Sequence, residues 1–203
     1  MGNNDQRGVT LIELMVTISI VVVILAIAVP SFKRFIETQR LRGVHNQIVT
    51  DLQFARAEAL QRRTPVHVAV RAQTASTGAC YTIFADLNRN FPFSTACDCS
   101  QPAGSRCSNP NSSDQTTEIR TVQLDPTLGI DLAAPVVARH GFDSESGALL
   151  VRLGDSAGNT FINRFAIDSF YDNGRKYRAA VEFSGRVTTC APTGSTVGAP
   201  TCP

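Results

Sequence analysis

The sequence predicts an α+β protein in which a long N-terminal helix packs on an antiparallel β-sheet. An apolar run covers residues 9–29, a helical pattern continues through residues 30–63, and short β-rich runs fill residues 64–203. Because the strands follow the helix rather than alternate with it, the arrangement is α+β and not α/β. With 203 residues and 43% hydrophobic content, the chain has room for one globular domain beyond the apolar run.

The apolar run is long enough to cross a membrane. As a helix, residues 9–29 would measure roughly 31 Å, which matches the hydrocarbon core of a bilayer. Glu13 is the only ionisable side chain in the run. A carboxylate immersed there costs about 2.5 to 3.5 kcal/mol, so Glu13 requires a partner that the segment itself does not supply.

The residues that flank the run indicate where such a partner arises. Residues 1–8, MGNNDQRG, form a short polar leader that ends in a basic residue and a glycine. No small-residue cleavage site follows the run, as a secretory signal would require. Cleavage after Gly8 would leave the run attached and create a new amine at Val9, four residues before Glu13.

The leader, the run VTLIELMV and Pro30 resemble the class III signal of type IV pilins and type II secretion pseudopilins. The resemblance implies that a prepilin peptidase cuts after Gly8 and methylates Val9. It also implies that Glu13 pairs with the N-terminal amine of a neighbouring subunit during assembly. Val9 stands where the family usually has phenylalanine, and both residues are apolar. The alternative is an ordinary signal anchor that contains a glutamate.

The second half of the helix carries an apolar stripe at steps of three and four residues, which predicts one buried face. The stripe consists of Leu41, Val44, Ile48, Leu52, Ala55 and Ala59. His45 is placed on the polar side of this stripe. Most of the charged residues of the segment are explained by a solvated face.

A second resemblance covers the end of the helix and both ends of the domain. The pattern A-R-x-E-A followed by a proline turn and a V-x-V strand is similar to the GspH/FimT branch of minor pilins and pseudopilins. The matching residues are Ala55, Arg56, Glu58, Ala59, Pro65 and Val66. YTIFADLNRN (81–90) and VEFSGRV (181–187) also resemble that branch.

The region beyond Thr64 predicts a head built of antiparallel strands. Its short runs are rich in β-branched and aromatic residues and are separated by Gly, Pro, Asn, Asp and Ser. The expected strands are residues 66–70, 81–85, 119–124, 149–153, 161–167 and 177–183.

Six cysteines, all beyond the apolar run, predict an oxidising compartment and three disulfides. Three of them lie in a polar stretch, residues 91–118, which is expected to be a stapled surface loop. Six cysteines allow 15 pairings, but a bond between Cys190 and Cys202 would close a short tail loop and is the most natural. A thiolate metal site from Cys80, Cys97, Cys99 and Cys107 is the alternative, and its C-x-C spacing fits poorly.

Two further motifs have a functional and a structural interpretation. Asp86, Asn88 and Asn90 match the opening of a calcium loop, but the glycine and the twelfth-position glutamate are missing; a strand-ending turn is favoured. GDSAG (154–158) fits a nucleophile elbow around Ser156, with His67 or His140 as base and Asp86 or Asp143 as orienting group. Because extended segments flank it on both sides, a hairpin turn is favoured.

A late G-R-x-R motif binds DNA in some members of the FimT branch, and this chain has the related sequence Gly185-Arg186-Val187-Thr188. The second arginine is missing, but strand pairing could bring Arg175, Lys176 and Arg178 close to Arg186. The alternative is that these are ordinary solvated charges, and a net charge of +2 does not by itself indicate a nucleic-acid partner.

These observations predict a non-enzymatic minor pilin with no cofactor and no metal. Its expected partners are other pilin subunits, the prepilin peptidase and an inner-membrane assembly platform. Double-stranded DNA is a further partner if the late cations form a site, but solvated charges are the favoured interpretation. The basic end of the leader and the cysteines favour a cytoplasmic N-terminus and a periplasmic head. The alternatives are a type II secretion pseudopilin and, more remotely, a membrane-anchored serine hydrolase.

Overall fold

The computed structural model describes residues 9–74, 77–87, 97–107, 115–134, 138–153, 164–172 and 174–202. The chain divides into two units, Met1–Arg40 and Leu41–Pro203, of which the second is the head. One helix, α1 (Leu11–Arg62), begins in the first unit and ends in the second. Within the first unit, the large apolar side chains of α1 are exposed throughout residues 11–29.

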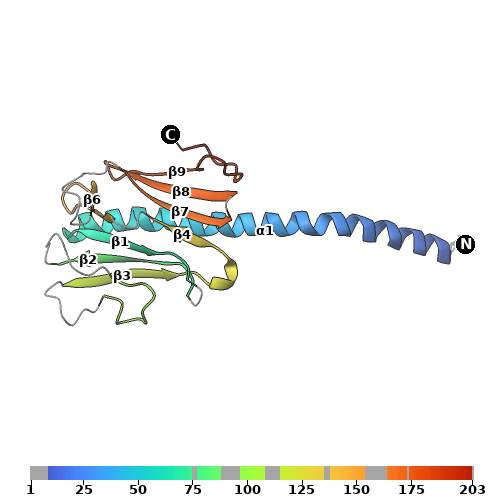
Figure 1. Cartoon of the computed structure of the whole chain (residues 1–203), viewed down its shortest axis with the longest axis horizontal. Coiled ribbons are helices and arrows are strands. Elements are labelled where there is room, and N and C mark those ends of the chain that lie inside the picture. The colour runs from blue at the N-terminus through green and yellow to red at the C-terminus, as the bar shows by residue number, and fades with distance from the viewer. Residues whose placement is uncertain are drawn as a thin grey trace, which may run out of the picture. The chain divides into compact units, whose positions relative to one another are not determined.

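The head contains two antiparallel sheets (Figure 1), where the sequence predicted one. The first has the order β3-β2-β1-β5-β6 and consists of β1 (Val66–Arg71), β2 (Cys80–Asp86), β3 (Thr116–Gln123), β5 (Ala138–Phe142) and β6 (Leu149–Leu153). The second has the order β4-β7-β8-β9 and consists of β4 (Asp131–Ala133), β7 (Arg164–Asp172), β8 (Arg175–Glu182) and β9 (Val187–Cys190).

The chain passes between the sheets where a hairpin was expected. β6 pairs with β5 in the first sheet, whereas β7 pairs with β4 and β8 in the second. β6 and β7 therefore do not pair as the two arms of a hairpin. Residues 154–158, where the hairpin turn was predicted, lie outside the described residues. The sequence signal was misleading because two β-rich runs separated by turn residues look alike whether or not they pair.

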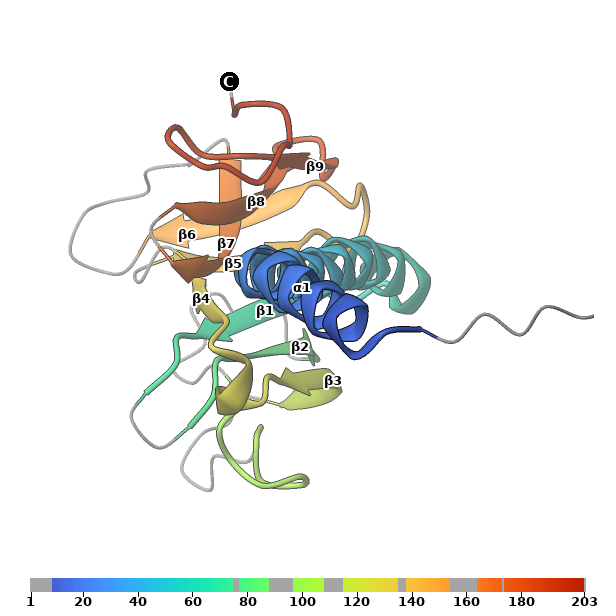
Figure 2. The same cartoon turned by 90° about the vertical axis from the view of Figure 1, so that its right-hand side faces the viewer.

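The head part of α1 packs against both sheets (Figure 2). Five stripe residues, Leu41, Ile48, Leu52, Ala55 and Ala59, are buried, and Val44 is half-buried. They meet inward-facing side chains such as Val68 of β1, Ile83 of β2 and Ile167 of β7. The predicted buried face is thus confirmed, and it serves two sheets at once.

Strand β2 is buried along its whole length because it is covered on both faces. Tyr81, Ile83 and Ala85 belong to the main core, on the side of α1. Phe84, which alternates with them, packs instead with Cys97 in a second, smaller cluster. The segment Cys97–Cys107 therefore covers the outer face of the first sheet.

Candidate functional site

The first helical turn of α1 is capped by Thr10. The backbone N–H of Glu13 donates to Thr10 Oγ1 at 3.3 Å, and the N–H of Leu14 donates to the Thr10 carbonyl oxygen at 3.2 Å. Thr-x-x-Glu is the sequence of a capping box, in which the first residue satisfies a backbone donor that the helix leaves open. Glu13 also lies at the helix end where the helix dipole favours negative charge.

The other polar side chains of the apolar run are satisfied inside the helix. Thr17 Oγ1 donates to the Leu14 carbonyl at 2.9 Å, and Ser19 Oγ donates to the Met15 carbonyl at 2.8 Å. Such bonds are what hydrocarbon surroundings require, because no water is available there. Glu13 forms no ion pair within the described part of the chain.

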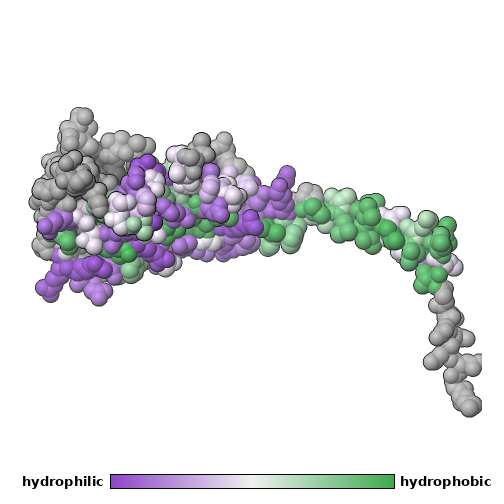
Figure 3. Space-filling view, turned by 90° about the horizontal axis from the view of Figure 1, so that it is seen from below, coloured by the Kyte–Doolittle hydropathy of each residue, from purple (hydrophilic) through white to green (hydrophobic). Residues whose placement is uncertain are grey.

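The large apolar side chains of residues 9–29 are exposed. One face of this segment is seen as the green N-terminal part of Figure 3. By length and composition the helix can cross a membrane. Gly8 lies outside the described residues, and Val9 is the first residue described. Val9 is exposed and directly precedes the cap at Thr10.

In the head, Arg178 is held by its neighbour on the adjacent strand. Arg178 and Asp168 are directly paired in the β7–β8 ladder. The Arg178 guanidinium donates Nε to Asp168 Oδ1 and Nη2 to Asp168 Oδ2, both at 2.7 Å. These hydrogen bonds raise the pKa of Arg178 above its usual value. The guanidinium is therefore already engaged within the protein.

Arg175 and Lys176 lie at the start of β8, beside aromatic rings of β7. The guanidinium carbon of Arg175 is 4.5 Å from the centre of the Tyr171 ring, and Lys176 Nζ is 5.4 Å from the centre of the Phe170 ring. The Ser195 hydroxyl of the tail forms two hydrogen bonds with the Lys176 backbone. It accepts from the N–H at 3.0 Å and donates to the carbonyl oxygen at 2.7 Å.

Arg186 is exposed and lies in the turn between β8 and β9, at the opposite end of β8 from Arg175. The Glu182 N–H donates to the Arg186 carbonyl, so Arg186 faces the last residue of the strand. At about 3.3 Å per residue, roughly 20 Å separate it from Arg175 and Lys176. The prediction that strand pairing brings these cations together is wrong. Arg186 lies beside Glu182 at the end of β8, whereas Arg175 and Lys176 lie at its start.

Two of the stretches that resemble the GspH/FimT branch, the helix end and residues 181–187, meet in space. Gly185 has φ +76°, and a Cβ on it would lie 2.0 Å from the Gly147 carbonyl oxygen and 2.9 Å from Arg56 Nε. Only glycine combines that backbone conformation with so close an approach. Arg56 of the helix motif and Gly185 of the late G-R motif thus fix the end of α1 against two turns of the head.

Three disulfides close the described part of the head: Cys80–Cys99, Cys97–Cys107 and Cys190–Cys202. The last joins the two cysteines that the sequence favoured as a pair. The segment Cys97–Cys107 is also tied to the sheet by Arg71–Asp98 at 2.8 Å and Arg106–Glu118 at 2.7 Å. Burial alone would raise the pKa of Asp98, but hydrogen bonds from Ser100 and the charge of Arg71 lower it.

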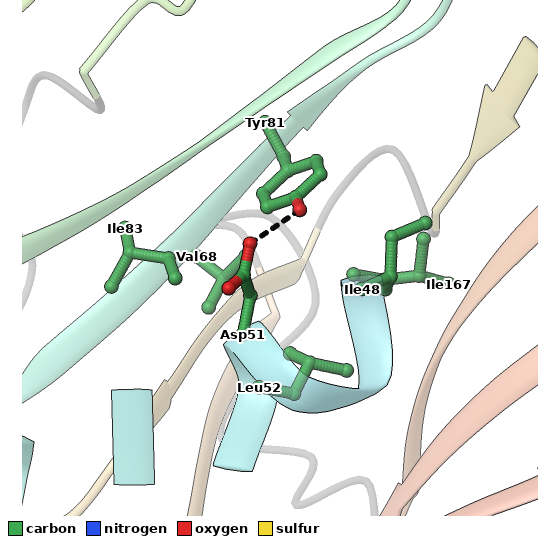
Figure 4. Close-up of a pocket in the computed structure, with 7 residues that line it drawn as sticks. All are labelled: Ile48, Asp51, Leu52, Val68, Tyr81, Ile83 and Ile167. Atoms are coloured by element: carbon green, nitrogen blue, oxygen red, sulfur yellow. Dashed lines mark hydrogen bonds between the residues drawn. The ribbon is translucent and has the colours of Figure 1, made fainter. Parts of the chain in front are cut away.

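A buried polar group on α1 was missed from the sequence. The side chain of Asp51 is only 2% exposed and lies against Arg120 Nη1 at 3.0 Å. The Tyr81 hydroxyl donates to Asp51 Oδ2 at 2.6 Å (Figure 4). Burial and this hydrogen bond raise the pKa of Tyr81. The gap that these residues line, with Ile48 and Val68 among others, is too narrow for a water molecule.

His45 was predicted on the polar side of the helix, and this is wrong. The side chain is buried, its Nδ1 lies 3.2 Å from Ser169 Oγ and its Nε2 lies 3.2 Å from Thr189 Oγ1. Its ring stacks on Tyr177 with centroids 4.9 Å apart. The signal was present in the sequence: His45 stands four residues after Leu41 and three before Ile48, which is stripe spacing.

The residues of the two alternative motifs are placed as follows. Ser156, Asn88 and Asn90 lie outside the described residues. His67 and His140 are buried in β1 and β5, where their rings face Phe84 and Phe165. Asp86 is buried at the end of β2, and the Asp143 carboxylate accepts backbone N–H groups of Glu145 and Ser146 in a turn. Within the described ranges, no three His, Cys, Asp or Glu side chains gather as a metal site would need.

Residues 3–29 match the prokaryotic N-terminal methylation motif. Together with the exposed apolar helix and the β-rich head, this match defines a membrane-anchored protein of the pilin or pseudopilin class.

Residues 45–185, more than half of the chain, match the family described as type II transport protein GspH. The chain therefore belongs to the GspH family. Members of these families are structural subunits that assemble with other pilin subunits after processing by a prepilin peptidase. No curated protein and no solved structure has a significant match to the chain.

Proposed function

We propose that the protein is a minor pilin of a type IV pilus, which enters the filament through residues 9–29 of its N-terminal helix. The observation that carries the proposal is the apolar surface of this segment, exposed on every side and interrupted only by Glu13 among ionisable groups. Such a surface is stable in a lipid bilayer or against other apolar helices, and unstable in water.

Glu13 is proposed to receive the N-terminal amine of a neighbouring subunit after cleavage behind Gly8. Two arguments support this role. Glu13 makes no ion pair within the described residues, and a lone carboxylate in hydrocarbon is costly until a cation neutralises it. Cleavage behind Gly8 would leave the new amine on Val9, directly before the cap at Thr10. Every processed subunit would therefore carry an amine of the same kind.

The proposed orientation has the N-terminus in the cytoplasm and the head on the far side of the inner membrane, where an assembly platform would take up the subunit. The three disulfides of the head support this orientation, because they persist in oxidising compartments. A disulfide-closed surface also suits a filament exposed outside the cell. The alternative is a type II secretion pseudopilin, and the genes that neighbour this one would distinguish a pilus from a secretion operon.

Mass spectrometry of the subunit purified from membranes or filaments tests the processing step. The wild-type chain is expected to begin at a methylated Val9. Gly8→Glu is expected to remain uncut and to stay out of filaments, because a bulky charged side chain replaces the glycine at the cleavage point. An intact Met1 in assembled filaments would overturn the proposal.

A pair of variants tests the role of Glu13. Glu13→Ala is expected to insert into the membrane at least as well as wild type, because the carboxylate is gone, and to enter sheared filaments poorly. Ser19→Ala is the matched control, since its hydroxyl bonds only within its own helix. Equal incorporation of Glu13→Ala and wild type would argue against the pairing.

DNA binding by the head is a second proposal, supported by the exposed Arg186 and by Arg175 and Lys176 at the other end of β8. Arg178 contributes less because Asp168 already holds it.

With three phosphate contacts, log K for DNA is expected to fall with log salt at a slope of about −2.7. Anisotropy titration of the full chain in neutral detergent, with duplex DNA, measures this slope. Arg186→Ser and Arg175→Ser/Lys176→Ser are each expected to flatten it, and unchanged slopes in both would refute the site.

A further inference from the structure

Two cations and two aromatic rings follow the apolar run of α1 at its C-terminal end. Phe32, Lys33, Arg34 and Phe35, here called the FKRF segment, are all exposed, with Phe32 at 63% and Phe35 at 58%. We propose that the FKRF segment binds the headgroups of anionic phospholipids and so fixes the depth of the helix in the membrane. The proposal rests on the membrane anchoring of residues 9–29.

The position of the segment along the helix matches the headgroup layer. At 1.5 Å per residue, Lys33 and Arg34 lie about 6 and 7.5 Å beyond Val29, the last apolar residue of the run. The headgroup region adds about 5 to 8 Å to each side of the hydrocarbon core. Arg40 lies about 16 Å beyond Val29 by the same rise, outside this layer.

The distribution of the side chains around the helix indicates a helix that crosses the layer rather than one that lies flat in it. Successive residues of an α-helix are about 100° apart, so Lys33 and Arg34 point to different sides. Phe32 and Phe35, three residues apart, share a third side. A helix lying in the membrane plane would gather its cations on one face opposite its apolar face.

The chemistry of the segment suits phosphate esters at an interface. The Arg34 guanidinium can hold a phosphate with two parallel N–H donors, and the Lys33 ammonium offers three rotatable ones. Each Lys or Arg next to the membrane increases the affinity for an anionic surface about fivefold. The aromatic rings of Phe32 and Phe35 provide apolar surface where hydrocarbon gives way to headgroups.

The cations also stand on the side where topology rules place few of them. The leader contains Arg7 and Asp5, whereas Lys33 and Arg34 follow the run without an acidic residue before Glu37. In the proposed orientation this side is translocated, which the positive-inside rule disfavours. Membrane orientation therefore does not explain why Lys33 and Arg34 are present, whereas binding to anionic headgroups does. When the helix leaves the membrane for a filament, Lys33 and Arg34 would have to release these headgroups.

Electron spin resonance of reconstituted protein tests the proposal. The full chain is placed in phosphatidylcholine bilayers that contain trace spin-labelled phosphatidylglycerol or spin-labelled phosphatidylcholine, and the relative association of the two labels is measured. The wild-type chain is expected to favour phosphatidylglycerol about fivefold or more at low salt. The preference is expected to shrink in high salt, because exposed charges are screened.

Two double variants with the same change in charge locate the effect. Lys33→Ser/Arg34→Ser is expected to reduce the preference to about one, and Arg40→Ser/Arg42→Ser is expected to leave it within about twofold of wild type. Lys33→Arg/Arg34→Lys keeps the charge and is expected to keep the preference. Retention of all variants in the membrane after alkaline extraction shows that the helix is inserted.

The outcomes separate the inference from the function on which it rests. Wild-type protein that is released by alkaline extraction would refute membrane anchoring itself. Inserted wild-type protein with no lipid preference, or with a preference that survives Lys33→Ser/Arg34→Ser, would refute the headgroup site. If the cations are instead needed for pairing with carboxylates of a neighbouring subunit, Lys33→Ser/Arg34→Ser would fail to enter filaments and wild type would show no lipid preference. This result would overturn the proposal.

Discussion

Residues 11–29 and residues 41–62 belong to one helix, but their side chains are adapted to different surroundings. The first stretch is apolar on every side and exposed, and the hydroxyl groups of Thr17 and Ser19 bond only within the helix. The second has one buried face, and that face includes the polar side chains of His45 and Asp51. Burial of a polar group requires partners held at fixed positions, and only the head supplies them.

The comparison shows what a helix can satisfy alone. Thr10, Thr17 and Ser19 need only the backbone of their own helix. His45 and Asp51 depend on strands far away in the sequence, through Ser169, Thr189, Tyr81 and Arg120. Glu13 differs from both groups, because an ionised carboxylate within an apolar surface needs a cation from outside the helix.

The same substitution in the two stretches should have very different effects. Ile48→Ala removes a fully buried side chain (0% exposed) and is expected to lower the free energy of unfolding of the head by about 2 to 5 kcal/mol. Ile24→Ala, at a position 59% exposed, is expected to leave the head unchanged. Urea unfolding of the full chain in neutral detergent, followed by near-ultraviolet circular dichroism, measures both. Equal midpoints for the two variants would contradict the comparison.

Opening the tail disulfide should destabilise the part of the head that contacts His45. Cys190→Ser/Cys202→Ser opens a loop closed across 12 residues and is expected to cost about 3 kcal/mol. The tail also holds Tyr177, whose hydroxyl donates to the Val197 carbonyl at 3.1 Å and whose ring stacks on His45. The same unfolding measurement reports the loss, and alkaline extraction should show unchanged membrane insertion. A head as stable as wild type would show that the tail contributes nothing to the fold.

Acid should destabilise the head through His45 before it affects the carboxylates. Burial lowers the pKa of His45 from 6.5 to about 4, although the charge of Asp168 opposes the shift. Between pH 6.5 and pH 4 the unfolded chain therefore binds one more proton than the folded chain. The free energy of unfolding is highest above pH 6.5 and decreases as the pH falls toward 4, by up to about 3 kcal/mol.

His45→Asn removes this titration and isolates its contribution. The stability of the variant, measured by urea unfolding at a series of pH values, is expected to vary less than that of wild type between pH 6.5 and 4.5. Carboxylates with lowered pKa values, such as Asp98 and Asp143, lose their contributions only at lower pH. Parallel pH profiles for the variant and wild type would refute the role of His45.

The smallest effect is expected at the cap. Thr10→Val removes the acceptor of the Glu13 N–H and is expected to weaken the first turn by about 1 kcal/mol. Hydrogen exchange of the Glu13 amide, followed by nuclear magnetic resonance in micelles, should accelerate about fivefold. Thr17→Val is the control, because its hydroxyl donates to a carbonyl and caps no amide. No difference between the variants would argue against a capping role.

Much of the candidate site could be predicted from local sequence. The apolar run, Glu13 and the stripe follow from spacing along one helix, and all six expected strands correspond to strands of the structure. β4, β5 and β9 were not predicted, because Asp131–Ala133 and Val187–Cys190 are short and Ala138–Phe142 contains His140 and Gly141. Strand existence is a local property, whereas the division into two sheets depends on pairing between distant segments.

The sequence by itself determined which residues form α1, which of its faces is apolar, and which signal precedes it, because helical periodicity and cleavage motifs are read over short distances. Only the tertiary structure decided the partners of His45 and Asp51, the meeting of Arg56 with Gly185, and the separation of Arg186 from Arg175. These depend on the approach of segments more than 50 residues apart in several cases, such as His45 and Ser169 with a separation of 124. Whether a polar group is buried or solvated depends on which distant segments pack against it, and the type of side chain alone does not specify this packing.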